Sequence, residues 1–258
     1  MKTLLIKYFV IPLLIFLCAC NNTESKLDGA YTLVAAKYGD SALSKEQIAK
    51  HKTLKICSNG YWISATFFGN PKITVESASG GTYILKNGKD VETVNFDSKN
   101  DSGAGKTYDF DYKLQGDKYT LKGMMSNDKC SSCFINEEYH KMELDKNLTD
   151  TSLEGVWKLQ MSEWFGKKVE DADFFQFKIY CYPYFVWAQY HSKGKDFIGV
   201  AGGTYRINGM KLVEHVEYFS FYDIIPYDFE IDLTKFPSGT IQEVSMNGGG
   251  KEIWKKIQ

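Results

Sequence analysis

The chain contains an internal duplication, and this feature limits its possible architecture more than any other. Gly80–Tyr83 is followed by Val91–Phe96, and the same block returns 122 positions later as Gly202–Tyr205 and Val213–Tyr218, with no internal gap. Solenoid repeats are roughly 20 to 50 residues long. A period above 100 residues therefore indicates a duplicated domain, and we expect two copies of one fold.

Weaker matches flank this block in the same order in both copies. The offset between the copies falls from 126 at their start to 119 near their end, as small insertions and deletions in surface loops would produce. Each copy has a little over 100 residues, which is enough for an independent core. The matching pairs are Leu27–Leu33 with Leu153–Leu159, Lys55-Ile56 with Lys178-Ile179, Tyr61–Ala65 with Tyr184–Ala188, and Tyr108–Asp111 with Tyr227–Glu230.

The first 20 residues have the pattern of a secretory signal and not of a folded segment. Lys2 and Lys7 give a basic start, and Phe9–Leu17 is apolar but too short for a comfortable membrane span. The end of this segment, Leu17–Cys20, resembles the bacterial lipobox, in which the final cysteine becomes lipidated. The resemblance implies that Cys20 carries the lipid. An ordinary cleaved signal with a coincidental cysteine is the alternative.

The signal and the repeat together define the expected boundaries. We expect a signal over residues 1–20, a polar tether over 21–26, one domain over 27–144, a polar linker over 145–152 and a second domain over 153–258. A lipid on one cysteine would hold both domains in water at a membrane surface. The expected location is the bacterial cell envelope, on the periplasmic face or the outer-membrane surface.

Four cysteines remain in the two expected domains. Cys130 and Cys133 are separated by two residues, and in an oxidising envelope we expect a disulfide that closes a tight loop. The alternative is a thiol–disulfide redox motif, which usually has its first cysteine at a helix N-terminus. The residues that follow have a strand pattern, which favours the structural disulfide. Cys57 and Cys181 occupy nearly equivalent places, so we expect each to lie in its own domain.

Most segments have the composition of β-strands, and short turn signals separate them. Hairpins are expected where Asn87-Gly88 and Gly116-Asp117 interrupt such segments. Ser44–Lys50 is expected to form a short helix with Ser44 as its N-cap, and Lys168–Asp173 is expected to form a shorter counterpart. Short strands joined by hairpins, with one helical piece after the first strand, are typical of an all-β up-and-down barrel or a closely related sandwich.

The best-matched strand has two different faces in both copies. Tyr61, Ile63, Ala65 and Phe67 share one face, which looks like core. The opposite face mixes rings with polar groups. If the sheet closes, one of these faces must line the interior, and alternation alone does not decide which. The mixed face carries Trp62, Ser64, Thr66 and Phe68 in the first copy, and Phe185, Trp187, Gln189 and His191 in the second.

Each copy opens with a glycine, one other residue and a ring, as Gly29–Tyr31 and Gly155–Trp157. This opening resembles the Gly-x-Trp motif of lipocalin and calycin barrels, whose ring plugs the closed end beneath the ligand cavity. Tyr139–Met142 and Trp254–Ile257 place a ring and a cation where that family closes its barrel with a basic residue. The chain lacks the family's Thr-Asp-Tyr segment. The resemblance implies two tandem lipocalin-like barrels, each with one short helix, that bind small apolar or amphipathic molecules.

Six aromatic rings are the candidates for barrel floors or a ligand pocket. Tyr31 and Trp157 are expected at the floors, where core filling is the plainer role. The densest aromatic run is Tyr180–Trp187, so we favour the second domain for binding, since ligand pockets are rich in aromatic side chains. The other candidates, for which plain core or surface packing is the alternative, are Trp62, Phe68, Phe185 and Trp187.

Other chemical signals are weaker. Glu92 and Glu214 are equivalent, as are Asp109 and Asp228, and paired carboxylates could serve a glycosidase. Their recurrence in both copies favours a structural role instead, such as a turn or a charge at a strand edge. No histidine has the spacing of a metal site, and no cofactor is expected. The net charge of −1 and the absence of long basic runs argue against nucleic acid.

The double glycines of the repeat invite comparison with a phosphate-binding loop. They are followed by Thr-Tyr and a strand, and not by the lysine and helix that such a loop requires. They therefore indicate a bulge or a close backbone approach before a barrel strand.

We therefore expect a non-enzymatic envelope lipoprotein that holds a small hydrophobic or amphipathic ligand, or a glycan fragment. One alternative is a protein–protein interaction module of the envelope whose barrels are filled by their own rings. A less favoured alternative is a carboxylate-dependent hydrolase.

Overall fold

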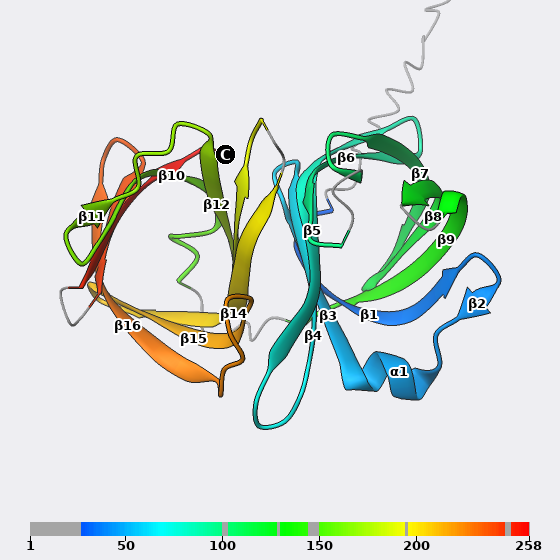
Figure 1. Cartoon of the computed structure of the whole chain (residues 1–258), viewed down its shortest axis with the longest axis horizontal. Helices are drawn as coiled ribbons and strands as arrows, with labels where there is room; N and C mark the ends of the chain where they lie inside the picture. The colour runs from blue at the N-terminus through cyan, green and yellow to red at the C-terminus, as the bar shows by residue number, and fades with distance from the viewer. Residues whose placement is uncertain are drawn as a thin grey trace, which may run out of the picture.

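The computed structural model describes residues 27–99, 103–127, 130–143, 150–193, 196–245 and 249–257. The predicted signal, lipidation site and tether (residues 1–26) lie outside these ranges, as does most of the predicted linker. The described residues form two closed, eight-stranded antiparallel barrels that lie side by side (Figure 1). The predicted all-β fold of two tandem barrels is confirmed.

The first barrel is an antiparallel meander that closes on itself. Its elements are β1 (Gly29–Tyr38), β2 (Ser41–Ala42), α1 (Lys45–Lys50), β3 (His51–Ser58), β4 (Tyr61–Phe68), β5 (Thr74–Lys86), β6 (Lys89–Asp97), β7 (Thr107–Gln115), β8 (Lys118–Asn127) and β9 (Cys130–Lys141). From β3 to β9 each strand pairs with the next, and β1 pairs with both β3 and β9. The two-residue β2 extends the end of β1.

The second barrel repeats this topology strand for strand. Its elements are β10 (Gly155–Trp164), β11 (Lys167–Lys168), β12 (Phe174–Cys181), β13 (Tyr184–His191), β14 (Phe197–Asn208), β15 (Lys211–Phe219), β16 (Tyr227–Phe236), β17 (Thr240–Ser245) and β18 (Gly250–Lys256). The strand β10 pairs with β12 and β18 and closes the ring. The closing pairs β1–β9 and β10–β18 carry equivalent bulges, after Leu33 and Leu159.

The helix predicted in the first copy is present, whereas its predicted counterpart in the second copy is not. Ser44 caps α1: its hydroxyl accepts a hydrogen bond from the Gln47 backbone N–H, and the Gln47 side chain accepts one from the Ser44 N–H. Lys168–Asp173 instead ends β11 and turns into β12. The Asp171 carboxylate accepts a hydrogen bond from the Asp173 N–H, which stabilises a turn in place of a helix.

The double glycines permit a close approach between neighbouring strands in both barrels. The pairing of β5 with β6 shifts between Gly80 and Gly81, and the pairing of β14 with β15 shifts between Gly202 and Gly203. A Cβ atom on Gly81 would lie 1.9 Å from the carbonyl oxygen of Thr93, and the same clash recurs at Gly203. A bulge with close backbone approach is therefore present in each copy, as predicted, but it lies within β5 and β14 and not before a strand.

A cluster of buried apolar side chains from both copies lies between the two barrels. It contains Ile56, Ile63 and Ala65 of the first barrel, together with Ile179 and Val186 of the second, among others. In Figure 1 the strands β3, β4 and β5 of one barrel face β12 and β14 of the other. The two barrels therefore share one hydrophobic core in addition to their separate interiors.

The contact between the barrels follows the symmetry of the duplication. Phe67 stacks on Tyr218 with ring centroids 4.5 Å apart, and Phe96 stacks on Tyr190 at 5.4 Å. In the repeat, Phe67 corresponds to Tyr190 and Phe96 corresponds to Tyr218. Each surface therefore contacts the equivalent surface of the other copy, which is the arrangement of an isologous dimer interface.

The structure assigns the two strand faces, and the face that looked like core does not line a barrel interior. Ile63, Ala65 and Phe67 pack between the barrels, whereas Trp62 lies inside the first barrel. The second copy has the same arrangement, with Trp187 packing against the interior cluster. The more apolar face has the pattern of a barrel interior because it is also buried, but the surface that buries it is the second barrel.

We expect the Phe67→Ala variant to destabilise the folded chain by about 3 kcal/mol, because truncating a buried ring leaves a cavity. Phe67 is 7 % exposed and packs across the barrel contact. Urea unfolding measures this loss of stability, and Ile84→Ala on the first barrel is the control. Ile84 is 64 % exposed, so its truncation should lower the free energy of unfolding by less than about 0.5 kcal/mol. Equal stabilities of the two variants would contradict a shared core.

Candidate functional site

The two predicted floor rings occupy equivalent positions at the start of β1 and β10. Tyr31 donates its hydroxyl hydrogen to the Leu27 carbonyl oxygen at 3.1 Å, and Trp157 donates its indole N–H to the Leu153 carbonyl oxygen at 2.7 Å. Both rings are almost fully buried. Each hydrogen bond ties the ring to the chain entering its barrel, so both rings close one end of a barrel.

A lysine from the last strand of each barrel lies against the floor ring. The Nζ atom of Lys141 is 5.8 Å from the Tyr31 ring centroid, and Nζ of Lys256 is 5.6 Å from the Trp157 ring centroid. Lys141 also donates to the Asp28 carbonyl oxygen at 2.7 Å. These lysines are the basic residues expected from the sequence at the end of each copy. They stabilise the closed ends through contact with the ring faces.

An ion pair is buried inside the first barrel. Lys55 Nζ lies 2.6 Å from Glu92 Oε1, and both side chains are nearly inaccessible. Burial is the largest single effect on Lys55 and disfavours its charge, but Glu92 together with the neighbouring acidic groups outweighs burial and raises the pKa of the lysine. Burial raises the pKa of Glu92 to about 7, although Lys55 opposes the shift. Trp62 lies against the pair, with its ring centroid 4.8 Å from Lys55 Nζ.

Further side chains occupy the first barrel around this pair. Tyr119 donates its hydroxyl hydrogen to Asp90 at 2.7 Å, and its ring stacks on Tyr139. The Lys55 ammonium lies 5.6 Å from each of these two ring centroids. Asp90 and both tyrosines are buried. The middle of this barrel therefore holds its own packed polar network.

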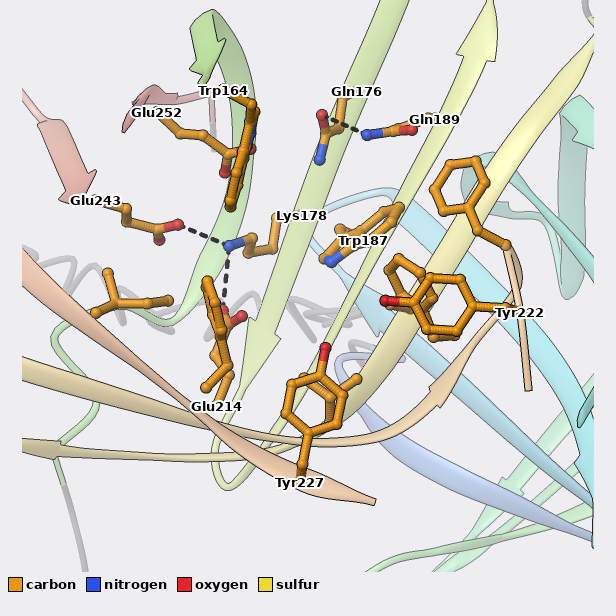
Figure 2. A pocket seen from close by; sticks show the side chains of 16 residues that line it. Trp164, Gln176, Lys178, Trp187, Gln189, Glu214, Tyr222, Tyr227, Glu243 and Glu252 are labelled. Atoms are coloured by element: carbon orange, nitrogen blue, oxygen red, sulfur yellow. Dashed lines mark hydrogen bonds and ion pairs between the residues drawn. The ribbon is translucent and has the colours of Figure 1, made fainter. Parts of the chain in front are cut away.

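The second barrel contains a cavity of about 370 Å³ that opens at the end opposite Trp157. Trp164 ends β10, Tyr222 follows β15 and Tyr227 begins β16, so these rings mark the open end (Figure 2). Every strand of the barrel except the two-residue β11 contributes to the wall. The lining residues are Trp164, Gln176, Lys178, Trp187, Gln189, Ala201, Glu214, Val216, Phe219, Phe221, Tyr222, Tyr227, Phe229, Ile231, Glu243 and Glu252.

A lysine paired with two glutamates lies in the wall of this cavity. Lys178 Nζ is 3.1 Å from Glu214 Oε1 and 2.8 Å from Glu243 Oε2, as Figure 2 shows. Tyr180 donates to the same two carboxylates, at 2.8 and 3.0 Å. Burial raises the pKa of Glu214, and the two carboxylates together raise the pKa of Lys178 above its usual value despite its burial. Lys178 and Glu214 occupy the positions of Lys55 and Glu92 in the first barrel.

A third carboxylate in the cavity wall has neutral hydrogen-bond partners. Glu252 Oε1 accepts from the Trp164 indole N–H at 3.2 Å and from the Ser162 hydroxyl at 3.5 Å. In the part of the chain that the structure describes, Glu252 forms no ion pair within 4.0 Å. Burial is the main cause that raises the pKa of Glu252 to about 7, with Lys178 opposing it and Glu243 adding to it.

Aromatic rings form the rest of the cavity wall. Trp164 packs near Phe229, with ring centroids 6.3 Å apart. On the other side Trp187 meets Phe219 edge-on at 6.0 Å, and Phe221 lies 6.5 Å from Trp187. The cavity thus combines several ring faces with a small number of charged and amide groups, which is typical of small-molecule sites.

The predicted site rings have separate locations. Trp187 lines the cavity of the second barrel. Trp157 and Phe185 are buried in the interior cluster of that barrel, and Tyr31 and Trp62 in that of the first. Phe68 instead lines a surface hollow beside α1 and contacts the His51 ring at 5.1 Å.

Most of the polar residues of the cavity were not predicted from the sequence, among them Lys178, Glu243 and Glu252. A signal for part of this group was present. Lys55 and Lys178 recur at matching positions within apolar strand segments, and Glu92 and Glu214 recur as well. A repeated lysine and a repeated glutamate in otherwise apolar surroundings indicate a buried ion pair, because unpaired charges are rarely buried.

The carboxylates considered for catalysis lie in different environments. Glu92 and Glu214 belong to the buried ion pairs, not to the turn or strand edge suggested by the sequence. Asp109 and Asp228 are exposed. Asp228 pairs with Arg206 at 2.8 Å and with His215 at 2.7 Å, and these contacts lower the pKa of its carboxyl.

The described residues include three of the four cysteine side chains expected in the two domains. Cys57 and Cys181 are free thiols, one in each barrel. Cys133 is disulfide-bonded, but the side chain of Cys130 lies outside the described residues, so the pairing of the two stays a prediction. Among the described residues, no group of histidine, cysteine and acidic side chains could hold a metal ion. In the same residues no helix is long and apolar enough to cross a membrane.

No protein-family model matches the chain, and no curated protein sequence matches it. Among solved structures it is similar to the uncharacterized protein YLR301w from Saccharomyces cerevisiae, at 11% sequence identity and a TM-score of 0.48. The match covers 89% of this chain and 97% of the yeast chain. This similarity is too distant to transfer a function.

We expect Lys55→Met to lower the free energy of unfolding by about 3 kcal/mol at pH 8, because it leaves the Glu92 carboxylate buried without its cation. The double variant Lys55→Met with Glu92→Leu should recover most of this loss, since no buried charge is then left unpaired. Urea unfolding of the wild type, both single variants and the double variant measures the coupling energy. Additive losses would show that the two side chains do not interact.

Proposed function

We propose that this protein is a membrane-anchored binding protein of the bacterial cell envelope, and that the second barrel holds a small amphipathic molecule. The observation that carries the proposal is the cavity of about 370 Å³ in that barrel. Sites for small molecules typically have volumes of about 300 to 1,000 Å³ and combine apolar walls with a few polar groups. The lipocalin-like openings and the lipobox support the same proposal from the sequence.

The contrast between the two barrels supports binding by the second. The central Lys–Glu pair is common to both. In the first barrel Tyr119 and Tyr139 pack over Lys55. The second barrel has Trp254 at the position of Tyr139, and this ring contacts Lys178 from the closed end. The cavity lies on the other side of Lys178, towards the open end. In the first barrel, side chains of the protein thus surround the central ion pair, whereas in the second barrel a cavity lies beside it.

One observation favours the alternative of an interaction module. Phe165, Phe221, Tyr222 and Ile225 are large apolar side chains with at least half of their surface exposed, and they lie on loops that follow β10 and β15. Exposed apolar groups that cluster mark binding surfaces for proteins or membranes. A carboxylate-dependent hydrolase is the third candidate, but the Glu214 and Glu243 carboxylates already accept hydrogen bonds from Lys178 and Tyr180.

Ligand binding should change the fluorescence of the cavity tryptophans. We expect saturable quenching of the purified protein by at least one member of a lipid and metabolite panel, and native mass spectrometry should detect the bound species. Trp187→Ala should weaken this binding about tenfold, because the ring covers one wall of the cavity.

The matched control for this experiment is Met210→Ala. Met210 is 77 % exposed in the turn between β14 and β15, at the closed end of the same barrel, so its removal should leave the affinity unchanged. Absence of quenching and of any retained species across all ligand classes would contradict the proposal.

The anchor can be tested independently of the ligand. We expect the chain to incorporate a labelled fatty acid in bacteria and to sediment with membranes, because a lipid on Cys20 would partition into the bilayer. Cys20→Ala should abolish labelling, whereas Cys18→Ala should retain it. Labelling that persists in Cys20→Ala would overturn the assignment of the lipidation site.

A further inference from the structure

The cavity of the second barrel is polar in its middle and aromatic at its open end. Lys178 and Glu214 are almost completely buried. At the open end Phe221 is 51 % exposed and Tyr222 is 63 % exposed. A molecule that enters from solvent therefore meets rings first and charged groups last. This order favours a ligand that inserts its polar group first and leaves its apolar part among the rings at the mouth.

The charged groups of the cavity have an excess of negative charge. Three carboxylates, those of Glu214, Glu243 and Glu252, face one ammonium group, that of Lys178 (Figure 2). The ammonium is already paired with Glu214 and Glu243. The remaining carboxylate, Glu252, is half-buried and has only the neutral donors Trp164 and Ser162 as hydrogen-bond partners among the described residues.

A carboxylate in this environment is stabilised by a positive charge. Burial of Glu252 raises the pKa of its carboxyl to about 7, so removing its proton at neutral pH is costly. A ligand cation beside it would offset that cost through a charge-assisted hydrogen bond or ion pair. An anion would instead approach three carboxylates, and the lysine that could attract it already has two partners.

The rings around Glu252 also suit a cation. Trp164 donates its indole N–H to Glu252, which fixes the orientation of its ring in the wall. Phe229 lies beside Trp164, and Trp187 faces the cavity from β13. Cations are attracted to the faces of aromatic rings, most strongly to tryptophan. A carboxylate beside one tryptophan, in a cavity whose opposite wall holds a second, can therefore recognise an organic ammonium group.

We propose that the second barrel binds amphipathic organic cations, with the ammonium group beside Glu252 and the apolar tail among the rings of the open end. This inference rests on the proposed binding function and adds the charge and orientation of the ligand. It also makes Glu252 a residue that determines specificity, whereas Lys178, Glu214 and Glu243 maintain the polar centre of the barrel.

Three amphipaths with the same ten-carbon tail test the proposal. Decyltrimethylammonium, decanoate and decyl maltoside are titrated into the purified full chain by calorimetry, below their critical micelle concentrations. We expect the cation to bind at least about tenfold more tightly than the other two. Glu252→Gln should remove this preference, because the amide keeps the shape of the side chain and lacks its charge.

A charge control and a pH series complete the test. Glu230→Gln removes one negative charge from an exposed position on β16 of the same barrel and should preserve the preference. In the wild type, affinity for the cation should fall about tenfold from pH 8 to pH 6 as Glu252 takes up a proton, since its pKa is about 7. Affinity for decyl maltoside should stay constant. The groups that face Glu252 are Lys178 on β12, Glu214 on β15, Glu243 on β17, and Trp164 and Ser162 on β10.

The possible outcomes separate this inference from the proposed function. Equal affinities for the three head groups, or a preference that survives in Glu252→Gln, would overturn the cation assignment and leave a binding barrel. Tighter binding of decanoate would overturn it as well. If none of the three compounds binds, the cation assignment is wrong, and the wider ligand panel decides whether the barrel binds anything else.

Discussion

The apolar contact between the barrels is the constraint on which the rest of the structure depends. Residues that alternate along a strand point to opposite sides of the sheet, so burying one face between the barrels commits the other face to an interior. Ile63 and Phe67 therefore pack across the contact, and Trp62 points into the first barrel. The interiors consequently receive the more polar face of the strands at this contact, among them β3 with Lys55 and β12 with Lys178.

A buried lysine requires a negatively charged partner. In both barrels this partner lies on the strand after the double glycine, which is β6 in the first barrel and β15 in the second. Lys55 pairs with Glu92, and Lys178 pairs with Glu214. The copies diverge around this shared centre. Glu243 and Glu252 add charge to the second barrel, which also contains the cavity. The duplication therefore kept the central ion pair in both copies, while the residues around it diverged.

Much of the fold could be predicted because its signals are local or repeated. The repeat identified two copies, and Ser44 with Gln47 specified the helix α1. Lys168–Asp173 was predicted wrongly, because Asp171 stabilises a turn there. The site was harder to predict, since its residues come from eight strands spread between Trp164 and Glu252. Of the six rings chosen from the sequence, only Trp187 lies in the wall of that cavity.

The sequence by itself determined the duplication, the strands with their alternating faces, and the ring at the start of each barrel. These features depend on residues that are near one another in the chain or that recur in both copies. Only the tertiary structure decided which face turns inward, because that choice depends on a second barrel more than 100 positions away. For the same reason it alone decided that Glu252 lies in the same cavity as Lys178: closure of the barrel brings the last strand, β18, beside the first, β10.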